Sequence, residues 1–134
     1  MIPIYRAWHH ELGRLMSVKC MFFQDSEIEE FELNDALMND CITADPDEIV
    51  LMQSTGLKDK NGKEIFEGDI LACKTDDEVI NLNVFWDEEH ALFMFESKKY
   101  NEQEPLAELV ENNTYPYEII GNIYENPELL EDKE

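Results

Sequence analysis

The chain has 134 residues, 43% of them hydrophobic, and its 10 Lys and Arg against 32 Asp and Glu leave a formal charge of −22. This length and apolar share suffice for one domain with one hydrophobic core. The negative field repels phosphate, so we expect neither direct nucleic-acid binding nor attachment to an anionic membrane surface. The segment Met1 to Trp8 lacks the pattern of a signal peptide, and no run approaches the ~20 apolar residues of a membrane-spanning helix, which together predict a cytoplasmic protein.

The first part of the chain predicts an N-terminal hairpin. Residues 2–8 are apolar and β-prone, and residues 16–22 alternate at a period of two. Gly13 lies between them, where a tight turn needs positive φ.

The next segment leaves two structures open. Residues 24–52 contain no Lys or Arg, and within residues 24–40 a helix and a strand fit the apolar spacing equally well. A turn at 45–47 then precedes a buried strand over 48–53.

The second half predicts short strands around one helix. Residues 55–62 carry Gly, Asp, Asn and Lys without an apolar period and indicate a loop. After it the patterns predict a strand over 70–73, a hairpin of 82–86 with 91–95, a short helix over 105–111 that ends at 112–116, a strand over 117–123 and a helix start at 126–128.

These elements predict an α+β but predominantly β fold. We expect a small SH3-like barrel or a strongly bent antiparallel sheet, with an N-terminal hairpin and one or two short helices. We expect a single domain over 1–134, in which 1–52 hold the hairpin and the acidic segment, 53–130 form the barrel-like part and 131–134 are a frayed tail.

No motif identifies a chemistry. The run from Asp59 begins like a calcium loop, but Lys63, Glu64 and Ile70 occupy its fifth, sixth and twelfth positions. The three His and three Cys lack the short paired spacings of zinc sites, and no Ser or Cys lies in a nucleophile motif. We therefore predict no catalytic residue, no metal site and no cofactor.

Two segments are candidate contacts with a partner. The first is an acidic face made of Asp25, Glu27, Glu29, Glu30, Glu32 and Asp35. This face is either a solvated surface or a carboxylate array that imitates the phosphates of a duplex and attracts a basic DNA-binding protein, and both interpretations stay open. The second is the loop made of Thr55, Gly56, Leu57, Lys58, Asp59, Lys60, Asn61 and Gly62, whose glycines could instead serve only backbone turns.

Three blocks of the sequence resemble the YopX family of phage and prophage proteins. They are the opening Tyr5-Arg6-Ala7-Trp8, the run from Leu51 to Ile70 and the ending from Ile119 to Leu130. Two positions depart from the family pattern, which tends to have Asp at the position of His9 and an aromatic residue at that of Ser54. The resemblance implies a phage or prophage protein in the cytoplasm of a bacterial host, and it transfers no catalytic residues.

The function predicted is therefore that of a phage- or prophage-encoded accessory protein that binds a host or phage protein without catalysis. Exposed edges of short strands also allow a homo-oligomer. One alternative is a metal-assisted hydrolase acting on nucleic acid or nucleotide, whose carboxylates should gather in one buried pocket. The other is a minor structural protein of the virion.

Overall fold

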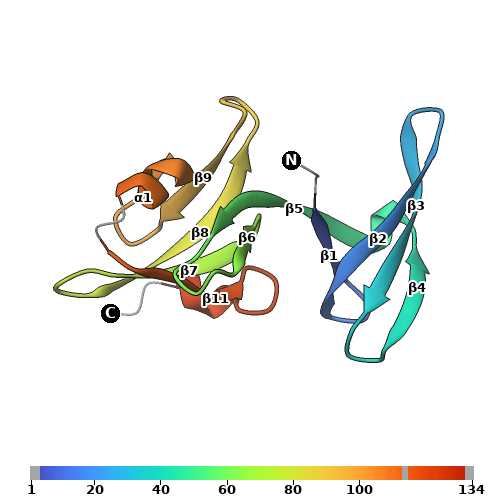
Figure 1. Cartoon of the computed structure of the whole chain (residues 1–134), viewed down its shortest axis with the longest axis horizontal. Helices are drawn as coiled ribbons and strands as arrows, with labels where there is room; N and C mark the ends of the chain where they lie inside the picture. The colour runs from blue at the N-terminus through green and yellow to red at the C-terminus, as the bar shows by residue number, and fades with distance from the viewer. Residues whose placement is uncertain (1–3, 113–114, 132–134) are drawn as a thin grey trace. The chain divides into compact units, whose positions relative to one another are not determined.

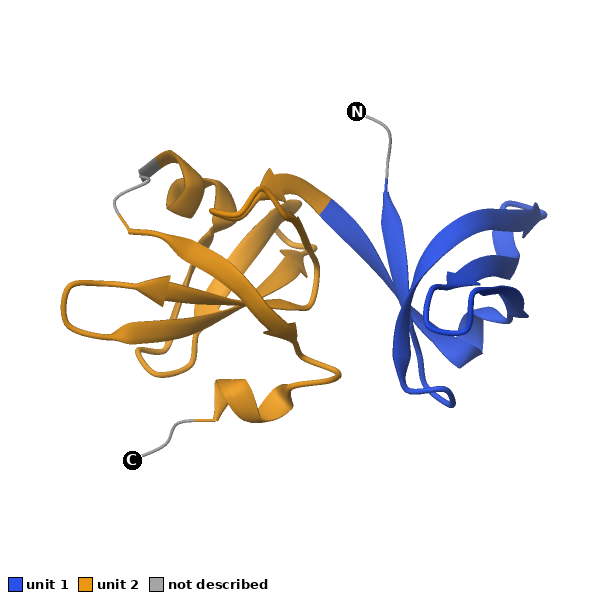
Figure 2. Cartoon of the chain, turned by 60° about the horizontal axis from the view of Figure 1, so that its bottom comes forward, with its two compact units in different colours: residues 1–54 blue, residues 55–134 orange. Residues whose placement is uncertain are grey.

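The computed structural model describes residues 4–112 and 115–131, so the predictions for residues 2–3, 113–114 and 132–134 lie outside the described residues. As the sequence predicts, the described chain is mostly β, with two antiparallel sheets and one short α-helix (Figure 1). It divides into two compact units, residues 1–54 and residues 55–134, here called unit 1 and unit 2 (Figure 2). No helix of the described part is long and apolar enough to cross a membrane.

Unit 1 is built on an antiparallel sheet. Its elements are β1 (Tyr5–His9), β2 (Arg14–Gln24), β3 (Glu27–Asp35), β4 (Asp40–Ala44), the 3-10 helix η1 (Pro46–Glu48) and the first part of β5 (Ile49–Lys58). The strand order is β4-β3-β2-β1-β5-β6, where β6 belongs to unit 2. The predicted N-terminal hairpin is the pair β1 and β2, and Gly13, with φ of 64°, closes its turn.

Residues 24–40, for which helix and strand both fitted the sequence, lie in strands and the turns between them. Phe31 and Leu33 are both buried on β3, at the period of two that a strand requires. Met38 would complete the helical face, but it is 65% exposed in the turn between β3 and β4. Pairing of β3 with β2 on one side and β4 on the other therefore decides the structure of this segment.

The core of unit 1 forms from the inward face of this sheet. Every member lies on a strand, and the buried residues are Ala7, Met16, Phe31, Leu33, Ala44 and Ile49. Half-buried apolar side chains of β2 and β3, among them Met21 and Ile28, extend this cluster along the hairpin.

Unit 2 contains a second antiparallel sheet, in the order β10-β9-β8-β7-β11. Its elements are β6 (Glu64–Phe66), β7 (Asp69–Lys74), β8 (Val79–Asp87), β9 (Leu92–Ser97), β10 (Glu102–Pro105), α1 (Leu106–Asn112), β11 (Tyr117–Asn122) and the 3-10 helix η2 (Pro127–Leu130). The predicted hairpin, helix and last strand are confirmed as β8 with β9, α1 and β11. In the described residues neither sheet closes into a barrel, so the predicted SH3-like barrel is not found and the fold consists of two antiparallel sheets.

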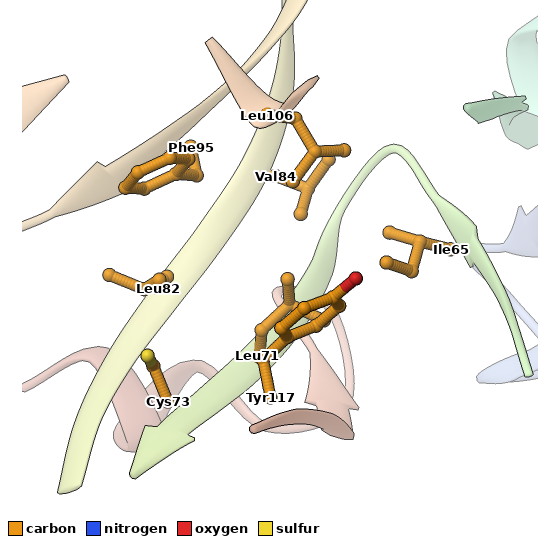
Figure 3. Close-up of a cluster of buried hydrophobic side chains, with 8 residues drawn as sticks. All are labelled: Ile65, Leu71, Cys73, Leu82, Val84, Phe95, Leu106 and Tyr117. Atoms are coloured by element: carbon orange, nitrogen blue, oxygen red, sulfur yellow. The ribbon is translucent and has the colours of Figure 1, made fainter. Parts of the chain in front are cut away.

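The core of unit 2 lies between the sheet, the helix and the β5–β6 hairpin. Figure 3 shows its buried side chains, which are Ile65, Leu71, Cys73, Leu82, Val84, Phe95, Leu106 and Tyr117. Leu106 is fully buried, and Leu109 and Val110 of the same helix pack against the cluster.

The expectation of one hydrophobic core is wrong. The described residues form two separate clusters, one built from residues 7–51 and the other from residues 57–119. Each sheet has its own apolar face, and each face is covered by elements of its own unit, because neighbouring strands in the sequence pair with one another. That the whole chain forms a single domain stays a prediction.

The turn at the tip of β2 and β3 gives a first testable prediction. Its two residues, Asp25 and Ser26, have φ of 52° and 69°, the geometry of a type I′ turn. Ser26→Gly relieves roughly 1–2 kcal/mol of left-handed strain against roughly 0.5–1 kcal/mol of added chain entropy. We expect a net gain of up to about 1.5 kcal/mol in the free energy of unfolding, measured by denaturant titration.

The matched control is Ser17→Gly, at an exposed position inside β2 where φ is not positive. Here glycine adds chain entropy and relieves nothing, so this variant should be less stable than wild type. Equal effects at the two serines would contradict the turn assignment.

Candidate interaction surface

The predicted loop at 55–62 is shorter in the structure. Thr55, Gly56, Leu57 and Lys58 belong to strand β5, so their assignment to a loop is wrong, and the turn begins at Asp59. Gly56 suggested a loop, yet its φ of 79° is accommodated within the strand. Leu57 packs against the core of unit 2, and Thr55 Oγ1 donates a hydrogen bond to the carbonyl of Ile65 at 2.7 Å. These contacts hold the segment in β structure.

The remaining loop is organised by the carboxylate of Asp59, which is only 7% exposed. Its Oδ1 accepts hydrogen bonds from the backbone N–H groups of Asn61 and Lys63, each at 2.9 Å. Its Oδ2 accepts one from the backbone N–H of Ile119 at 3.0 Å, which joins the loop to strand β11. The side chain therefore serves as a structural clamp.

Three further contacts attach this loop and the end of β5 to β11. The backbone N–H of Lys60 donates to the carbonyl of Tyr117 at 3.1 Å, and Tyr117 Oη donates to the carbonyl of Lys58 at 3.2 Å. The Lys60 ammonium lies 3.7 Å from a carboxylate oxygen of Glu118. These contacts support the interpretation in which the residues of this block serve backbone turns.

The acidic face divides into exposed and committed residues. Asp25, Glu27 and Glu29 are exposed at and beside the tip of the β2–β3 hairpin. Glu30 and Glu32 are half-buried on β3, and the Glu32 carboxylate lies 3.4 Å from the Lys19 ammonium.

Asp35 does not belong to this face, which corrects the prediction. It is 3% exposed, and both of its oxygens accept hydrogen bonds from the Arg14 guanidinium. Its Oδ1 also accepts the backbone N–H of Leu37 at 3.2 Å. These hydrogen bonds, first of all those from Arg14, hold the pKa of the Asp35 carboxyl below its ordinary value. The period of two along β3 turns Asp35 to the same side as Phe31 and Leu33, and Arg14 neutralises it there.

The exposed end of the hairpin, residues 20–30, is here called the acidic arm. Besides its carboxylates it carries Phe22 and Phe23, which are 48% and 63% exposed. No Lys or Arg occurs anywhere from residue 20 to residue 57. The lack of cations is visible in the sequence, but the exposure of the two phenylalanines is not, because the alternation within residues 16–22 gives no sign that the strand extends beyond the core.

Possible ligands for a metal also meet in one exposed turn. In the described chain, oxygen and nitrogen atoms of Asp87, Glu89 and His90 lie within 4.8 Å of one another, and His90 Nδ1 is 2.7 Å from Asp87 Oδ2. The buried carboxylates lie elsewhere and do not converge. Asp35 contacts Arg14 in unit 1, while Asp59 and Asp69 of unit 2 each close a different turn, Asp69 by accepting the backbone N–H of Phe66 at 2.8 Å.

Comparison with known proteins places this arrangement in a family. The family model described as YopX protein matches residues 4–131. The chain belongs to the YopX family. Among solved structures, the YopX-family chain is similar to protein EF1440 from Enterococcus faecalis, with 29% identity and a TM-score of 0.70 over 98% of this chain and 99% of that one. It also shares the fold of protein yopX from Bacillus subtilis, with 20% identity and a TM-score of 0.62 over 96% and 98% of the two chains. No curated protein matches the sequence.

The two longer YopX-like blocks coincide with turns built from Asp and Asn side chains. In the ending block, Asn122 Oδ1 accepts the backbone N–H groups of Tyr124 and Glu125 at 3.0 and 2.9 Å. A Cβ on Gly121 would lie 2.8 Å from Cγ of Asn126, so this glycine permits a close approach. These blocks therefore build the scaffold of unit 2, while the acidic arm lies outside them in unit 1.

The clamp made by Asp59 gives a second prediction. Burial alone raises the pKa of this carboxyl, but the hydrogen bonds from Ile119, Lys63 and Asn61 outweigh burial and lower it below the ordinary value of 3.8. A carboxylate whose pKa is lowered by folding stabilises the protein above its unfolded pKa, and this contribution is lost as the pH falls through the folded pKa. Asp59→Asn should lower the free energy of unfolding by about 1–3 kcal/mol at pH 7.

Denaturant titrations at a series of pH values check this prediction. The difference between wild type and Asp59→Asn should begin to shrink as the pH falls below about 3.8, the ordinary pKa that applies to the unfolded chain. It should disappear as the pH falls through the lower pKa of the folded carboxyl. The exposed turn residue Asp76 provides the control, since Asp76→Asn should change stability little at any pH. A difference that stays constant down to low pH would show that the charge of Asp59 is not what the loop needs.

Proposed function

We propose that this YopX-family chain is a non-catalytic module that binds a basic partner protein through its acidic arm. The observation that carries the proposal is the exposure of Phe22 and Phe23 beside the carboxylates of Asp25, Glu27 and Glu29. As part of the same proposal, the protein is encoded by a phage or prophage and meets a host or phage protein in the bacterial cytoplasm.

The exposed phenylalanines supply the apolar part of such a contact. Aromatic residues dominate the energy of protein interfaces, and full burial of a Phe side chain contributes roughly 1.5–3 kcal/mol. Phe22 and Phe23 lie on opposite faces of the hairpin near its tip, so a partner that covers both faces gains an aromatic anchor on each. A type I′ turn also holds them in place, so little conformational entropy is lost on binding.

The surrounding charges determine the kind of partner. Because residues 20–57 hold ten Asp and Glu and no Lys or Arg, the field around the arm attracts cationic surfaces and repels nucleic acid and anionic lipid. Carboxylates at the rim of a contact raise the association rate and exclude acidic competitors. A protein with a basic surface and an accessible apolar pocket is the complement of this arm.

The arrangement of carboxylates favours binding over metal-assisted hydrolysis. Hydrolysis of that kind needs several carboxylates that converge in a pocket. Here the buried carboxylates are each engaged by Arg14 or by backbone N–H groups, at separate places in the two units. The loop at 59–63 is the second candidate contact, and its backbone is already bound to β11.

The charge of the arm can be tested with a matched pair of triple variants. The arm variant is Asp25→Asn, Glu27→Gln and Glu29→Gln. The control variant is Asp76→Asn, Asp77→Asn and Glu88→Gln, which removes the same charge from exposed turns of unit 2. Wild type and the control should retain the same partner from bacterial lysate at moderate salt, and the arm variant should bind that purified partner at least tenfold more weakly.

Equal affinity of the two triple variants for the purified partner would contradict a role for the arm. If neither variant nor wild type retains a stoichiometric partner above low salt, the acidic arm is a solvated surface and the binding function is wrong. If the arm variant recovers the partner and the control variant does not, the contact lies elsewhere on the chain.

The phenylalanines give a separate prediction. Phe22→Ser with Phe23→Ser should weaken binding of the same partner by at least tenfold, with the dissociation rate changing more than the association rate, because apolar contacts form after electrostatic encounter. Stability should change little, since both side chains are largely solvated. Trp86→Ser, at an exposed position of β8 in unit 2, is the control and should leave binding unchanged.

A further inference from the structure

Strand β2 is more than twice as long as its neighbour β1, so one of its edges is only partly covered. β1 pairs with residues 14–17 of β2, from His9 opposite Arg14 to Arg6 opposite Ser17. From residue 18 onward β2 pairs with β3 alone among the described strands. Figure 1 shows the β2–β3 hairpin projecting past the end of β1. The other edge of residues 20–24 therefore has no neighbouring strand in the described chain.

An uncovered edge of this kind presents backbone N–H and C=O groups to any extended chain that approaches it. The opposite edge of the same sheet is partly closed, because the Asp40 carboxylate on β4 accepts the backbone N–H of Cys41 at 2.8 Å. On β2 Lys19 is the extra residue of a bulge, and a second register shift between Phe22 and Phe23 skips Glu29 of β3, so the second extra residue lies on β3 and not on β2. Of the two edges, β2 is thus the one able to accept another strand.

The two faces beside this open edge differ in chemistry. Residues directly opposite in an antiparallel pair share a face. One face pairs Met21 with Phe31 and Phe23 with Ile28, so it is apolar from the core to the tip. The other face pairs Phe22 with Glu30, and the preceding and following pairs place Glu32 and Glu27 on the same side. A chain added here would meet an apolar face on one side and carboxylates on the other.

A hollow lies where β1 ends beside this edge. It has a volume of about 410 Å³ and is lined by Ile4, Tyr5, Val18, Lys19, Cys20 and Met21. Ile4 is exposed, and Tyr5, Val18 and Met21 are half-buried. An extended segment along the edge of residues 20–24 would lie beside Cys20 and Met21, which line this hollow.

We propose that the partner binds by adding an extended segment as a further strand along residues 20–24 of β2. This inference rests on the proposed function and names the recognised segment, which alternates apolar with Lys or Arg residues. Its apolar side chains lie on the face of Met21 and Phe23, and its cations lie on the face of Glu27 and Glu30. Backbone hydrogen bonds provide affinity in this mode, and the alternate side chains provide specificity.

The test uses the full-length protein and a synthetic eight-residue peptide of alternating Lys and Val. Two isomers of the peptide are N-methylated on every Val amide or on every Lys amide. Alternate N–H groups of a strand point to the same edge, so one isomer loses the hydrogen bonds to β2 and the other retains them, while charge and side chains are the same. We expect the parent peptide to bind and one isomer to bind at least tenfold more weakly by calorimetry.

Amide hydrogen exchange followed by NMR locates the contact. Peptide binding should slow exchange at least tenfold at some amides of residues 20–24, where no described strand pairs with the outward edge. Phe23→Ser should weaken binding of the parent peptide, and Trp86→Ser should leave that binding unchanged. Protection confined to β4 or to unit 2 would overturn the proposal.

The outcomes separate this inference from the proposed function. If both methylated isomers bind as tightly as the parent, the contact depends on charge and side chains alone, so strand addition is wrong and the binding function stands. If no peptide binds but the arm triple variant still loses the natural partner, strand addition is wrong and the binding function of the arm stands. If neither peptide nor partner depends on the arm, both proposals fail.

Discussion

Carboxylates outnumber cations so strongly in this protein that most of them cannot form an ion pair, and the structure depends on how that excess is accommodated. With 32 Asp and Glu and 10 Lys and Arg, a buried carboxylate must in most cases be stabilised by something other than a cation. Asp59 and Asp69 are stabilised by backbone N–H groups, and Asp35 alone of these three has an arginine. Such hydrogen bonds favour the ionised form, which allows an acidic chain to bury carboxylates without burying equal numbers of lysines.

The same constraint shapes the surface of unit 1. Cations near β2 and β3 are used at one end of the hairpin, where Arg14 binds Asp35 and Lys19 lies beside Glu32. Beyond Lys19 the hairpin has carboxylates but no Lys or Arg, and its end carries the exposed pair Phe22 and Phe23. An isolated exposed aromatic residue is common in monomers, but two adjacent ones on a strand with a free edge and a uniform charge are typical of a contact surface. In unit 2 the family blocks form turns closed by Asp and Asn side chains. The turns of these blocks and the acidic arm therefore lie in different units.

Several parts of the fold could be predicted because local pattern and tertiary environment agree. The alternation of Leu82 and Val84 with Asn81 and Asn83 predicts a strand of a hairpin, which is confirmed as β8, and Leu106 begins the helix that its spacing indicates. Gly13 closes the first turn because a residue without a Cβ adopts the positive φ that this turn needs. Gly56 has the same property, yet it lies within strand β5, since pairing of Thr55 with Ile65 holds the backbone there. A glycine signals positive φ but does not say whether a strand or a loop surrounds it.

By itself, the sequence determined the charge of the protein, its predominantly β class, its family and most of the strands of unit 2, because each of these depends on composition or on neighbours a few residues apart. Only the tertiary structure decided that residues 27–35 are a strand, that two clusters replace one core, that Asp35 leaves the acidic face and that Phe22 and Phe23 are exposed. Each of these outcomes depends on which strand lies beside which, and on where that neighbour ends. The sequence of an alternating strand is the same whether or not another strand lies beside it. The arm has no described neighbour on this edge because the pairing of β1 with β2 stops at Ser17.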